Sequence, residues 1–477
     1  MTEKFEASFA SLYGYRCPEW FRDAKFGIWS HWGPQSVPMF GDWYARNMYI
    51  QGSKQYNYHV RHYGHPSKFG YKDICALWKA ERFEPDRLMG LYHKAGARYF
   101  VAQAMHHDHF FNYRSSVNKF NSVNIGPGRD ICELWKQAAD KYEIPFGLTE
   151  HLGASFSWWY PNKGADTYGP YKDVPYDGSD SKYRDFYFAN EEHYKPGHKG
   201  ELIKWMTENK EFQKYWLSVI KELVDKFHPA LLYSDSALPF DRENYQPGLE
   251  AVSYLYNASL TVNGENRAVY TQKDRNEEVY RVGTLDIEKS QLPGRMEEPW
   301  QTDTCIGNWF YDAGETYKRP EQLIEMLVDI ISKNGNMLLN ILQRPDGTID
   351  EEAEYILEEM GKWFSVCAEG VYKTRPYHVF GEGPTTVLID GFTENKTDWT
   401  EADYRFTRKD NIIYAFMMKA PERRAAVIKS LLPGEEIKRV RLLGAGEVPF
   451  SQNYGIVTVK LPDELPVKCA NCLALEI

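Results

Sequence analysis

The chain has 477 residues and a formal net charge of −10, and 15% of its side chains are aromatic. This length holds one barrel-sized domain plus a smaller one. An acidic balance without a basic stripe argues against a nucleic-acid partner, and no apolar run approaches the roughly 18 residues that a membrane span needs. Residues 1–10 lack the basic and apolar regions of a signal peptide. We therefore expect a soluble protein, while its compartment and oligomeric state stay open.

Short apolar runs alternate with amphipathic helical stretches between about residues 25 and 365. The clearest helix covers 211–227, where apolar side chains recur at helical spacing, and 230–233 follows it as a strand. The same pattern predicts strands at 97–104 and 144–148. Repeated strand and helix units with polar residues at the strand ends favour a TIM-like (β/α)-barrel over an open sheet.

Polar, titratable side chains follow several of these predicted strands. Directly after 97–104 come His106, His107, Asp108 and His109. Other strand ends carry His31, Glu150, His151 and Asp235. Because the carboxyl ends of barrel strands meet at one mouth, we expect these side chains to converge there.

The segment 153–200 is too long and too polar for a simple connection. It places Trp158, Trp159 and Tyr160, and then a series of tyrosines that ends at Tyr194, among glycines, prolines and charged residues. Long loops in compact domains are usually functional or disordered, and the aromatic density argues against disorder. We predict a loop that covers a substrate.

The pattern changes after about residue 370, where short alternating segments are separated by turn residues. Segments 386–389, 412–416 and 456–459 predict strands of a small antiparallel β-sandwich. We therefore expect a barrel domain at 1–370 and a sandwich domain at 371–477. Cys469 and Cys472 lack the second pair that a zinc ribbon needs, so we expect ordinary buried thiols.

Two chemistries fit a mouth of this composition. His107 and His109 form a His-x-His pair that could hold zinc in a metal-dependent barrel hydrolase, although such enzymes usually carry the pair in their first unit. Glycoside hydrolysis needs two carboxylates and aromatic platforms for the sugar, but no metal. The acidic balance, the aromatic loop and the carboxylates at strand ends favour glycoside hydrolysis.

Several motifs, in the same order, resemble those of the family-29 glycoside hydrolases, the α-L-fucosidases. They lie at 20–21, 25–33, 42–49, 95–99, 106–108, 121–130, 336–341 and 346–349. The resemblance extends over essentially the whole chain. It implies a (β/α)-barrel followed by a β-sandwich, a retaining mechanism without metal or cofactor, and an oligosaccharide or polysaccharide substrate with terminal α-L-fucose.

The resemblance also implies roles for individual residues. Asp235 falls where the family carries its nucleophilic aspartate. We assign the acid/base to Glu288, with Glu297 and Glu298 as alternatives, because its position varies within the family. The predicted sugar-binding residues are His31, Asp42, Trp43, His106, His107, Glu150, His151, Arg275 and Trp300.

Some positions depart from the family pattern. Asp42 stands where the family has a glutamate, and Met105 stands where it has a lysine. Gln301 replaces the glutamate that follows Trp300, and residues 149–151 replace a tyrosine-rich motif. All but Met105 put different polar groups near the expected sugar site, and such changes can redirect specificity strongly. An α-L-galactosidase, or a hydrolase of a modified L-fucose, is therefore an alternative. A sugar-binding protein without catalytic activity is another.

Overall fold

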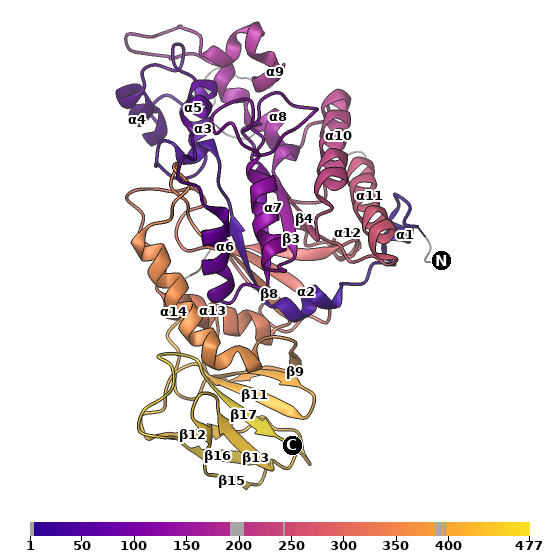
Figure 1. The fold of residues 1–477 in the computed structure, drawn as a ribbon, viewed down its shortest axis with the longest axis vertical. Coiled ribbons are helices and arrows are strands. Elements are labelled where there is room, and N and C mark those ends of the chain that lie inside the picture. Colours follow the sequence, from indigo (N-terminus) through magenta and orange to yellow (C-terminus); the bar gives the residue numbers. More distant parts are fainter. Residues whose placement is uncertain (1–3, 191–204, 242–243, 388, 390–393, 395–396) are drawn as a thin grey trace.

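The computed structural model describes residues 4–190, 205–241, 244–387, 389, 394 and 397–477. Its centre is a closed barrel in which parallel strands follow one another in chain order, and the eighth strand pairs with the first (Figure 1). This confirms the predicted barrel. The strands are β1 Phe26–Ser30, β2 Tyr99–Met105, β3 Phe146–Glu150, β4 Leu231–Ser234, β5 Val269–Gln272, β6 Thr284–Glu288, β7 Trp300–Cys305 and β8 Gly335–Asn340.

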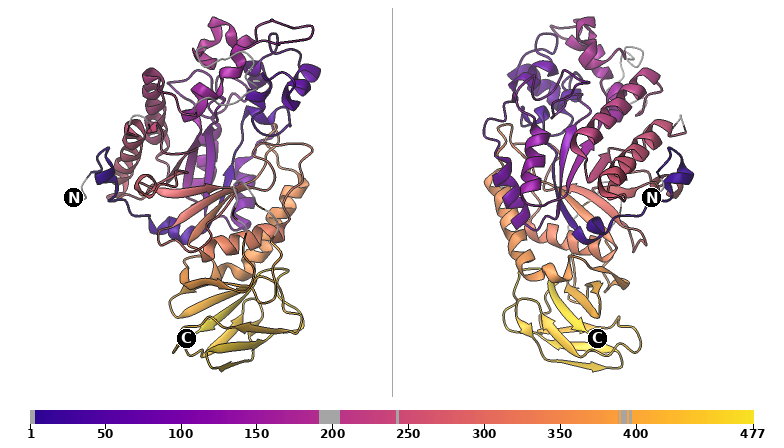
Figure 2. Two further views of the ribbon diagram at one scale, coloured as in Figure 1. Left: turned by 180° about the vertical axis from the view of Figure 1, so that it is seen from behind. Right: turned by 45° about the vertical axis from the view of Figure 1, so that its right-hand side comes forward.

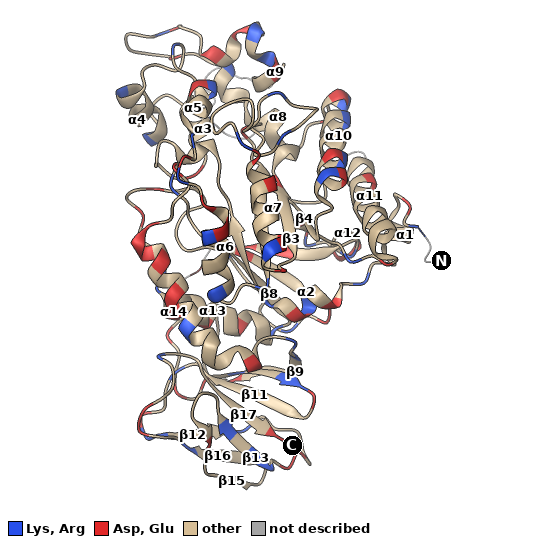
Figure 3. Ribbon diagram, viewed as in Figure 1, with Lys and Arg blue, Asp and Glu red and all other residues tan. Residues whose placement is uncertain are grey.

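Helices cover the outside of the barrel. The covering helices are α6 Pro85–Lys94, α7 Ile131–Lys141, α10 Lys210–Phe227, α11 Gln246–Asn263, α12 Glu277–Tyr280, α13 Pro320–Ser332 and α14 Glu351–Cys367. The predicted helix at 211–227 is α10; the Asn209 side chain caps it by accepting from the Phe212 amide, and it ends at His228 in the left-handed region. Acidic and basic residues are both present on α6, α7 and α10, whereas α14 carries mostly acidic ones (Figure 3).

The short helix α2 (Glu19–Ala24) closes the bottom of the barrel. Phe21 packs inside with Trp29 and Tyr99. The Tyr99 ring fills the space above Gly27, where an added Cβ would lie 2.4 Å from that ring. Only glycine fits at this point of β1, so the bottom of the barrel is a packed core and the open end is the mouth.

A layer of short helices lies over the mouth, at the end of the molecule opposite to the C-terminal domain (Figure 2). It includes α3 Tyr44–Asn47, α4 Lys54–His62, α5 Tyr71–Leu77, η2 Leu152–Ala154, α8 Ser155–Trp158, η3 Tyr160–Lys163, η4 Asp177–Ser179, η5 Ser181–Tyr183 and α9 Arg184–Tyr187. The described part of the predicted covering loop, 153–190, belongs to this layer and buries Trp158 and Trp159, whereas Tyr194 lies outside the described residues. Two further short helices are α1 Phe9–Leu12 and η1 Pro34–Ser36.

The C-terminal domain consists of two antiparallel sheets, in the strand orders β14-β13-β17-β11-β10-β9 and β12-β16-β15. Their strands are β9 Arg375–Glu382, β10 Tyr404–Lys409, β11 Ile412–Met417, β12 Ala425–Ile428, β13 Arg439–Leu442, β14 Gly446–Glu447, β15 Phe450–Asn453, β16 Ile456–Lys460 and β17 Asn471–Glu476. Side chains from both sheets share one apolar core, which is the arrangement of a sandwich. Since η8 (Ala368–Gly370) ends just before β9, we propose the domain division at 370/371.

The predicted strands at 412–416 and 456–459 are β11 and β16. The prediction at 386–389 is wrong for Thr386, Val387 and Ile389, which lie outside any strand, and Leu388 is outside the described residues. Here the chain has left the sheet, and the side chain of Asp403 binds the amide and hydroxyl of Thr385.

A buried ion network joins the two parts of the molecule. Asp329 of α13 is paired with Arg405 of β10, and its other oxygen lies 2.7 Å from Nζ of Lys333. All three side chains are almost completely buried. All seven cysteines are free thiols, and within the described ranges no helix is long and apolar enough to cross a membrane.

Replacing Gly27 with alanine should lower the free energy of unfolding by about 1–3 kcal/mol, because the new methyl group overlaps the buried Tyr99 ring. The measurement is the midpoint of denaturant unfolding. Gly294→Ala is the matched control, because no heavy atom lies within 4 Å of its added Cβ. Equal midpoints for the two variants would contradict the close packing at the bottom of the barrel.

Candidate active site

A cavity of about 500 Å³ opens at the mouth of the barrel. It brings together most of the side chains expected from the strand ends, among them Asp235 and Glu288. Its lining consists of Trp29, His31, Asp42, Trp43, His106, His107, His151, Trp205, Tyr233, Asp235, Ser236, Lys273, Glu288, Asp303 and Trp309.

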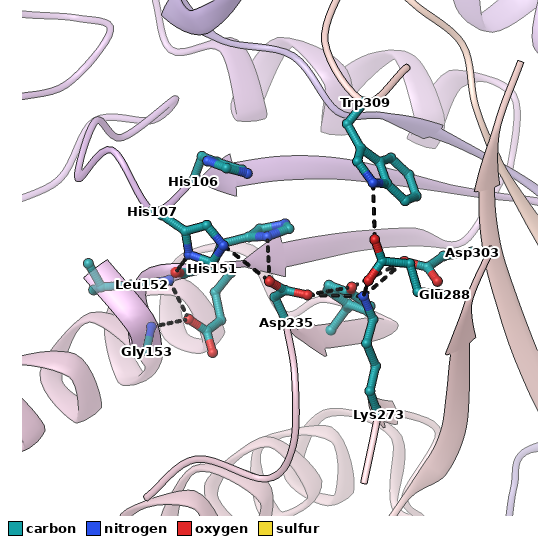
Figure 4. A network of polar contacts seen from close by, with 12 residues as sticks. His106, His107, His151, Leu152, Gly153, Asp235, Lys273, Glu288, Asp303 and Trp309 are labelled. Atoms are coloured by element: carbon teal, nitrogen blue, oxygen red, sulfur yellow. Dashed lines mark hydrogen bonds and ion pairs between the residues drawn. The ribbon is translucent and has the colours of Figure 1, made fainter. Parts of the chain in front are cut away.

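Asp235 directly follows β4 and makes contacts on both carboxylate oxygens (Figure 4). Oδ1 lies 3.0 Å from Nζ of Lys273 and accepts a hydrogen bond of 3.1 Å from the Tyr233 hydroxyl. Oδ2 lies 3.2 Å from Nε2 of His107 and 3.5 Å from Nδ1 of His151. Burial alone would raise the pKa of Asp235, but Lys273 and the two histidines outweigh it and hold this pKa well below its usual value. The carboxylate is therefore ionised, as a nucleophile must be.

Glu288 is the last residue of β6. Its Oε2 lies 2.6 Å from Nζ of Lys273, and its Oε1 accepts a hydrogen bond of 3.0 Å from the Trp309 indole. Burial raises the pKa of Glu288, Lys273 opposes the rise, and the charges of Asp303 and Asp235 add to it, so the pKa stays above its usual value. A raised pKa is what a carboxyl group needs in order to act as a general acid.

Lys273, the residue after β5, joins these two carboxyl groups. Its ammonium contacts Asp235 and Glu288 and lies 3.5 Å from Oδ2 of Asp303. Burial would lower the pKa of Lys273, but the surrounding carboxylates raise it well above its usual value. The two oxygens bonded to Nζ lie 3.0 Å and 2.6 Å from it, so their separation cannot exceed the sum of these distances. This bound is compatible with the roughly 5–5.5 Å separation of retaining glycosidases.

A second carboxylate pair lies below Lys273, inside the barrel. Burial and the charge of Asp303 raise the pKa of Asp286 well above its usual value, which favours the neutral form of Asp286. Gln301 donates to Asp286 through Nε2 at 2.5 Å and accepts a hydrogen bond of 2.8 Å from Tyr99. We expected Gln301 to alter the sugar site; this was wrong, because its side chain lies in the barrel interior and does not line the cavity.

Three histidines form the floor of the cavity. Their ring centroids lie 5.1 Å (His31–His106), 5.2 Å (His31–His151) and 4.8 Å (His106–His151) apart. Burial and mutual repulsion lower the pKa of His31 and His106 well below the usual value, and burial also lowers that of His151. The rings are therefore neutral near pH 7, and each can donate one hydrogen bond and accept another.

Aromatic side chains form the walls. Trp43 and Trp205 are stacked with ring centroids 6.1 Å apart and planes 19° apart, and Trp309 lies beside Trp29 on another wall. Asp42 is next to Trp43, and burial raises the pKa of Asp42 to about 7. Flat apolar walls with a few polar groups match the alternating apolar and hydroxylated faces of a sugar ring.

Three of the predicted sugar-binding residues lie outside the cavity lining, so the structure does not bring them together with the others. Glu150 is buried behind the mouth, where it accepts hydrogen bonds from the amides of Leu152 and Gly153 and thereby fixes the turn after β3. Trp300 begins β7 at the opposite end of the barrel, where its indole donates to the Lys333 carbonyl at 3.0 Å. Arg275 is exposed in the segment between β5 and α12.

The cationic residue that sequence reasoning missed is Lys273. Its position could have indicated a site residue, because Lys273 comes directly after a strand, as His31 and Asp235 do. Glu297 and Glu298, the alternatives for the acid/base, are exposed and do not line the cavity, while Asp42, Trp43, His31, His106, His107 and His151 do.

A barrel mouth that joins an ionised carboxylate, a carboxyl group of raised pKa, neutral histidines and tryptophan walls is the site of a glycoside hydrolase. The family model for alpha-L-fucosidase matches residues 1–369. The chain therefore belongs to the alpha-L-fucosidase family, the one that the sequence motifs resemble.

Individual relatives agree with this membership. The plasma alpha-L-fucosidase of Homo sapiens is 28% identical over 99% of this chain and 92% of its own length. The tissue alpha-L-fucosidase of Rattus norvegicus is 27% identical over 91% and 84%. The structure of Thermotoga maritima alpha-fucosidase in complex with fucose has the same fold, with a TM-score of 0.76 at 24% identity over 99% of this chain and 100% of that one.

Replacing Lys273 with methionine should shift both limbs of the pH profile of kcat/KM upward by more than about one pH unit. The ammonium lowers the pKa of both Asp235 and Glu288, so its loss raises both values. Activity at acid pH is then lost because Asp235 becomes protonated. The alkaline limb moves to higher pH because Glu288 loses its proton at higher pH. Lys273→Arg keeps the charge and should leave the limbs near those of the wild type; an unshifted Lys273→Met profile would contradict the assignment.

Proposed function

We propose that this protein is a retaining, exo-acting α-L-fucosidase that releases terminal α-L-fucose from glycans, with Asp235 as nucleophile and Glu288 as acid/base. The observation that carries the proposal is that two carboxyl groups share one ammonium group while their pKa values are shifted in opposite directions. Membership of the family supports α-L-fucose as the sugar that is released, because the relatives compared above are alpha-L-fucosidases. A Bacteroides thetaiotaomicron alpha-L-fucosidase of similar fold, trapped as a covalent intermediate (TM-score 0.69, 15% identity), is consistent with the retaining course.

In the first step, a carboxylate oxygen of Asp235 attacks the anomeric carbon and the bond from this carbon to the leaving oxygen breaks. Glu288 transfers its proton to the leaving oxygen, so the aglycone departs as an alcohol. The products of this step are a glycosyl ester on Asp235 and an ionised Glu288.

In the second step, Glu288 takes a proton from water, and the resulting hydroxide displaces Asp235 from the anomeric carbon. The geometry supports this change of role. The negative charge of Asp235 contributes to the raised pKa of Glu288, and esterification removes that charge. The pKa of Glu288 then falls, which suits a group that must remain ionised until water arrives.

The side chains of the floor and walls support recognition of a sugar. Neutral His31, His106 and His151 offer donors and acceptors to hydroxyl groups, and Trp43 offers a flat apolar face. The α-L-galactosidase alternative is not favoured, because the named relatives are fucosidases. Faster hydrolysis of an aryl α-L-galactoside than of the matching aryl α-L-fucoside would contradict the proposed substrate.

Asp235→Ala should lower kcat for an aryl α-L-fucoside by at least about 10³-fold, because the covalent route loses its nucleophile. The measurement is the initial rate of phenol release. A variant that hydrolyses as fast as the wild type would show that another group attacks the sugar.

Glu288→Ala should lose about 10²–10⁴-fold with an aryl fucoside whose phenol leaves poorly, and much less with a dinitrophenyl leaving group, which needs no proton. Added azide should accelerate the variant by attacking the glycosyl-enzyme without base catalysis. Glu298→Ala is the matched control and should behave like the wild type. If Glu298→Ala loses activity while Glu288→Ala keeps it, the acid/base is Glu298.

A further inference from the structure

His107, His151 and Asp235 form a cluster in which every side chain offers one atom to the same point of the cavity. One nitrogen of each ring and one oxygen of Asp235 lie within 4.8 Å of one another. Oδ2 of Asp235 lies 3.2 Å from Nε2 of His107 and 3.5 Å from Nδ1 of His151. In a tetrahedral zinc site with bonds of about 2.0–2.1 Å, neighbouring ligand atoms are roughly 3.3–3.4 Å apart. The two separations from Oδ2 of Asp235 lie on either side of this value, and the third, between the two ring nitrogens, is no more than 4.8 Å.

The second nitrogen of His107 fixes how the ring faces the cluster. Its Nδ1 lies 2.6 Å from the backbone oxygen of His151, and because a carbonyl only accepts, Nδ1 carries the hydrogen. The other ring nitrogen, Nε2, faces Oδ2 of Asp235 at 3.2 Å and is the atom that a metal ion would bind. Histidine ligands of metal ions are oriented in the same way, by donating the other ring N–H to a carbonyl or carboxylate.

His151 adds an unsatisfied group to the cluster. Its side chain is 4% exposed, and neither ring nitrogen has a hydrogen-bond partner among the described residues. A buried imidazole of this kind favours a ligand that takes up its lone pair. The cavity in front of the cluster leaves room for a further ligand, such as water.

A neighbouring cluster of His31, His106 and His151 has compatible spacing but less suitable chemistry. Gln35 accepts from the Ala45 amide through Oε1, which turns its Nε2 toward Nδ1 of His106 at 2.7 Å. Nδ1 of His106 is then the acceptor, so Nε2 carries the hydrogen and has no lone pair to give. This cluster also lacks a carboxylate to balance the charge of an ion.

We propose that a zinc-class transition-metal ion binds Nε2 of His107, Nδ1 of His151 and Oδ2 of Asp235, and that it inhibits the enzyme reversibly by occupying the nucleophile. Two imidazoles and one carboxylate suit Zn²⁺ or Co²⁺ and disfavour Mg²⁺ and Ca²⁺, which require oxygen ligands. The ion is an inhibitor and takes no part in the reaction, because it blocks the oxygen that must attack the sugar. Inhibition rests on the proposed role of Asp235, whereas binding of the ion does not.

The experiment uses the full chain without a histidine tag, freed of metal with EDTA and dialysed. Co²⁺ is titrated while its visible d–d absorption is recorded, and hydrolysis of an aryl α-L-fucoside is measured with Zn²⁺, with Mg²⁺ and after addition of EDTA. We expect one equivalent of Co²⁺ with a tetrahedral spectrum, displacement by Zn²⁺, inhibition by Zn²⁺ but not by Mg²⁺, and full recovery with EDTA. An absorption spectrum that does not change as Co²⁺ is added to the protein, beyond that of free Co²⁺, would overturn the proposal.

Variants locate the ion. His107→Phe and His151→Phe should each weaken Co²⁺ binding by more than about tenfold, and Asp235→Asn should do the same if a phenylalanine variant fails to fold. His31→Phe, in the neighbouring cluster, and the exposed His62→Phe should retain the Co²⁺ spectrum. Loss of the spectrum in His31→Phe with retention in His107→Phe would overturn the assignment in favour of the neighbouring cluster.

The outcome also separates this proposal from the proposed function. If Co²⁺ binds through His107, His151 and Asp235 while Zn²⁺ leaves hydrolysis unchanged, the site stands and Asp235 is not the nucleophile. If Asp235→Ala is inactive but the wild-type enzyme binds no Co²⁺, the nucleophile stands and the metal site is refuted.

Discussion

The active site depends on the position of one buried ammonium group. Lys273 contacts Asp235 and Glu288 and lies beside Asp303, so a single positive charge faces three carboxyl groups. One charge cannot stabilise three ionised neighbours equally. The histidines stabilise ionised Asp235 further and its pKa is lowered, whereas Glu288 has the weaker set of partners and its pKa is raised. Asp235 and Glu288 thus take different roles because one ammonium group cannot neutralise both of them.

The barrel is what makes this arrangement possible. Asp235 follows β4, Lys273 follows β5, Glu288 ends β6 and Asp303 lies on β7, so neighbouring strands supply each member. Parallel pairing brings these strand ends side by side at one mouth. Beneath them, neutral Asp286 and the Tyr99–Gln301 hydrogen bond fill the interior. The charged layer therefore lies on a polar but uncharged support.

The sequence predicted the parts of the site that strand ends and family motifs mark. His31, His106, His107, His151 and Asp235 follow strands, and all of them line the cavity. The predicted residues that do not line the cavity have suitable chemistry, but the sequence does not show in which direction their side chains point. Glu150 also ends a strand, yet its side chain turns back to bind the amides of Leu152 and Gly153.

For Arg275 and Trp300, the position of the residue along the chain relative to its strand is decisive. Arg275 and Lys273 are two residues apart, and only the point at which β5 ends decides which of them enters the mouth. Trp300 lies at the beginning of its strand rather than at its end, so it faces the bottom of the barrel. Element boundaries of this precision cannot be read from apolar periodicity alone.

The buried network of Asp329, Lys333 and Arg405 has a consequence for how the chain folds. Without β10, Asp329 would keep Lys333 but lose Arg405, and the side of α13 that packs on β9 and β10 would be open to water. The barrel is therefore less stable without the C-terminal sheets. Its last helices are completed by the C-terminal sheets, and heat or denaturant should melt the two parts in a single cooperative transition.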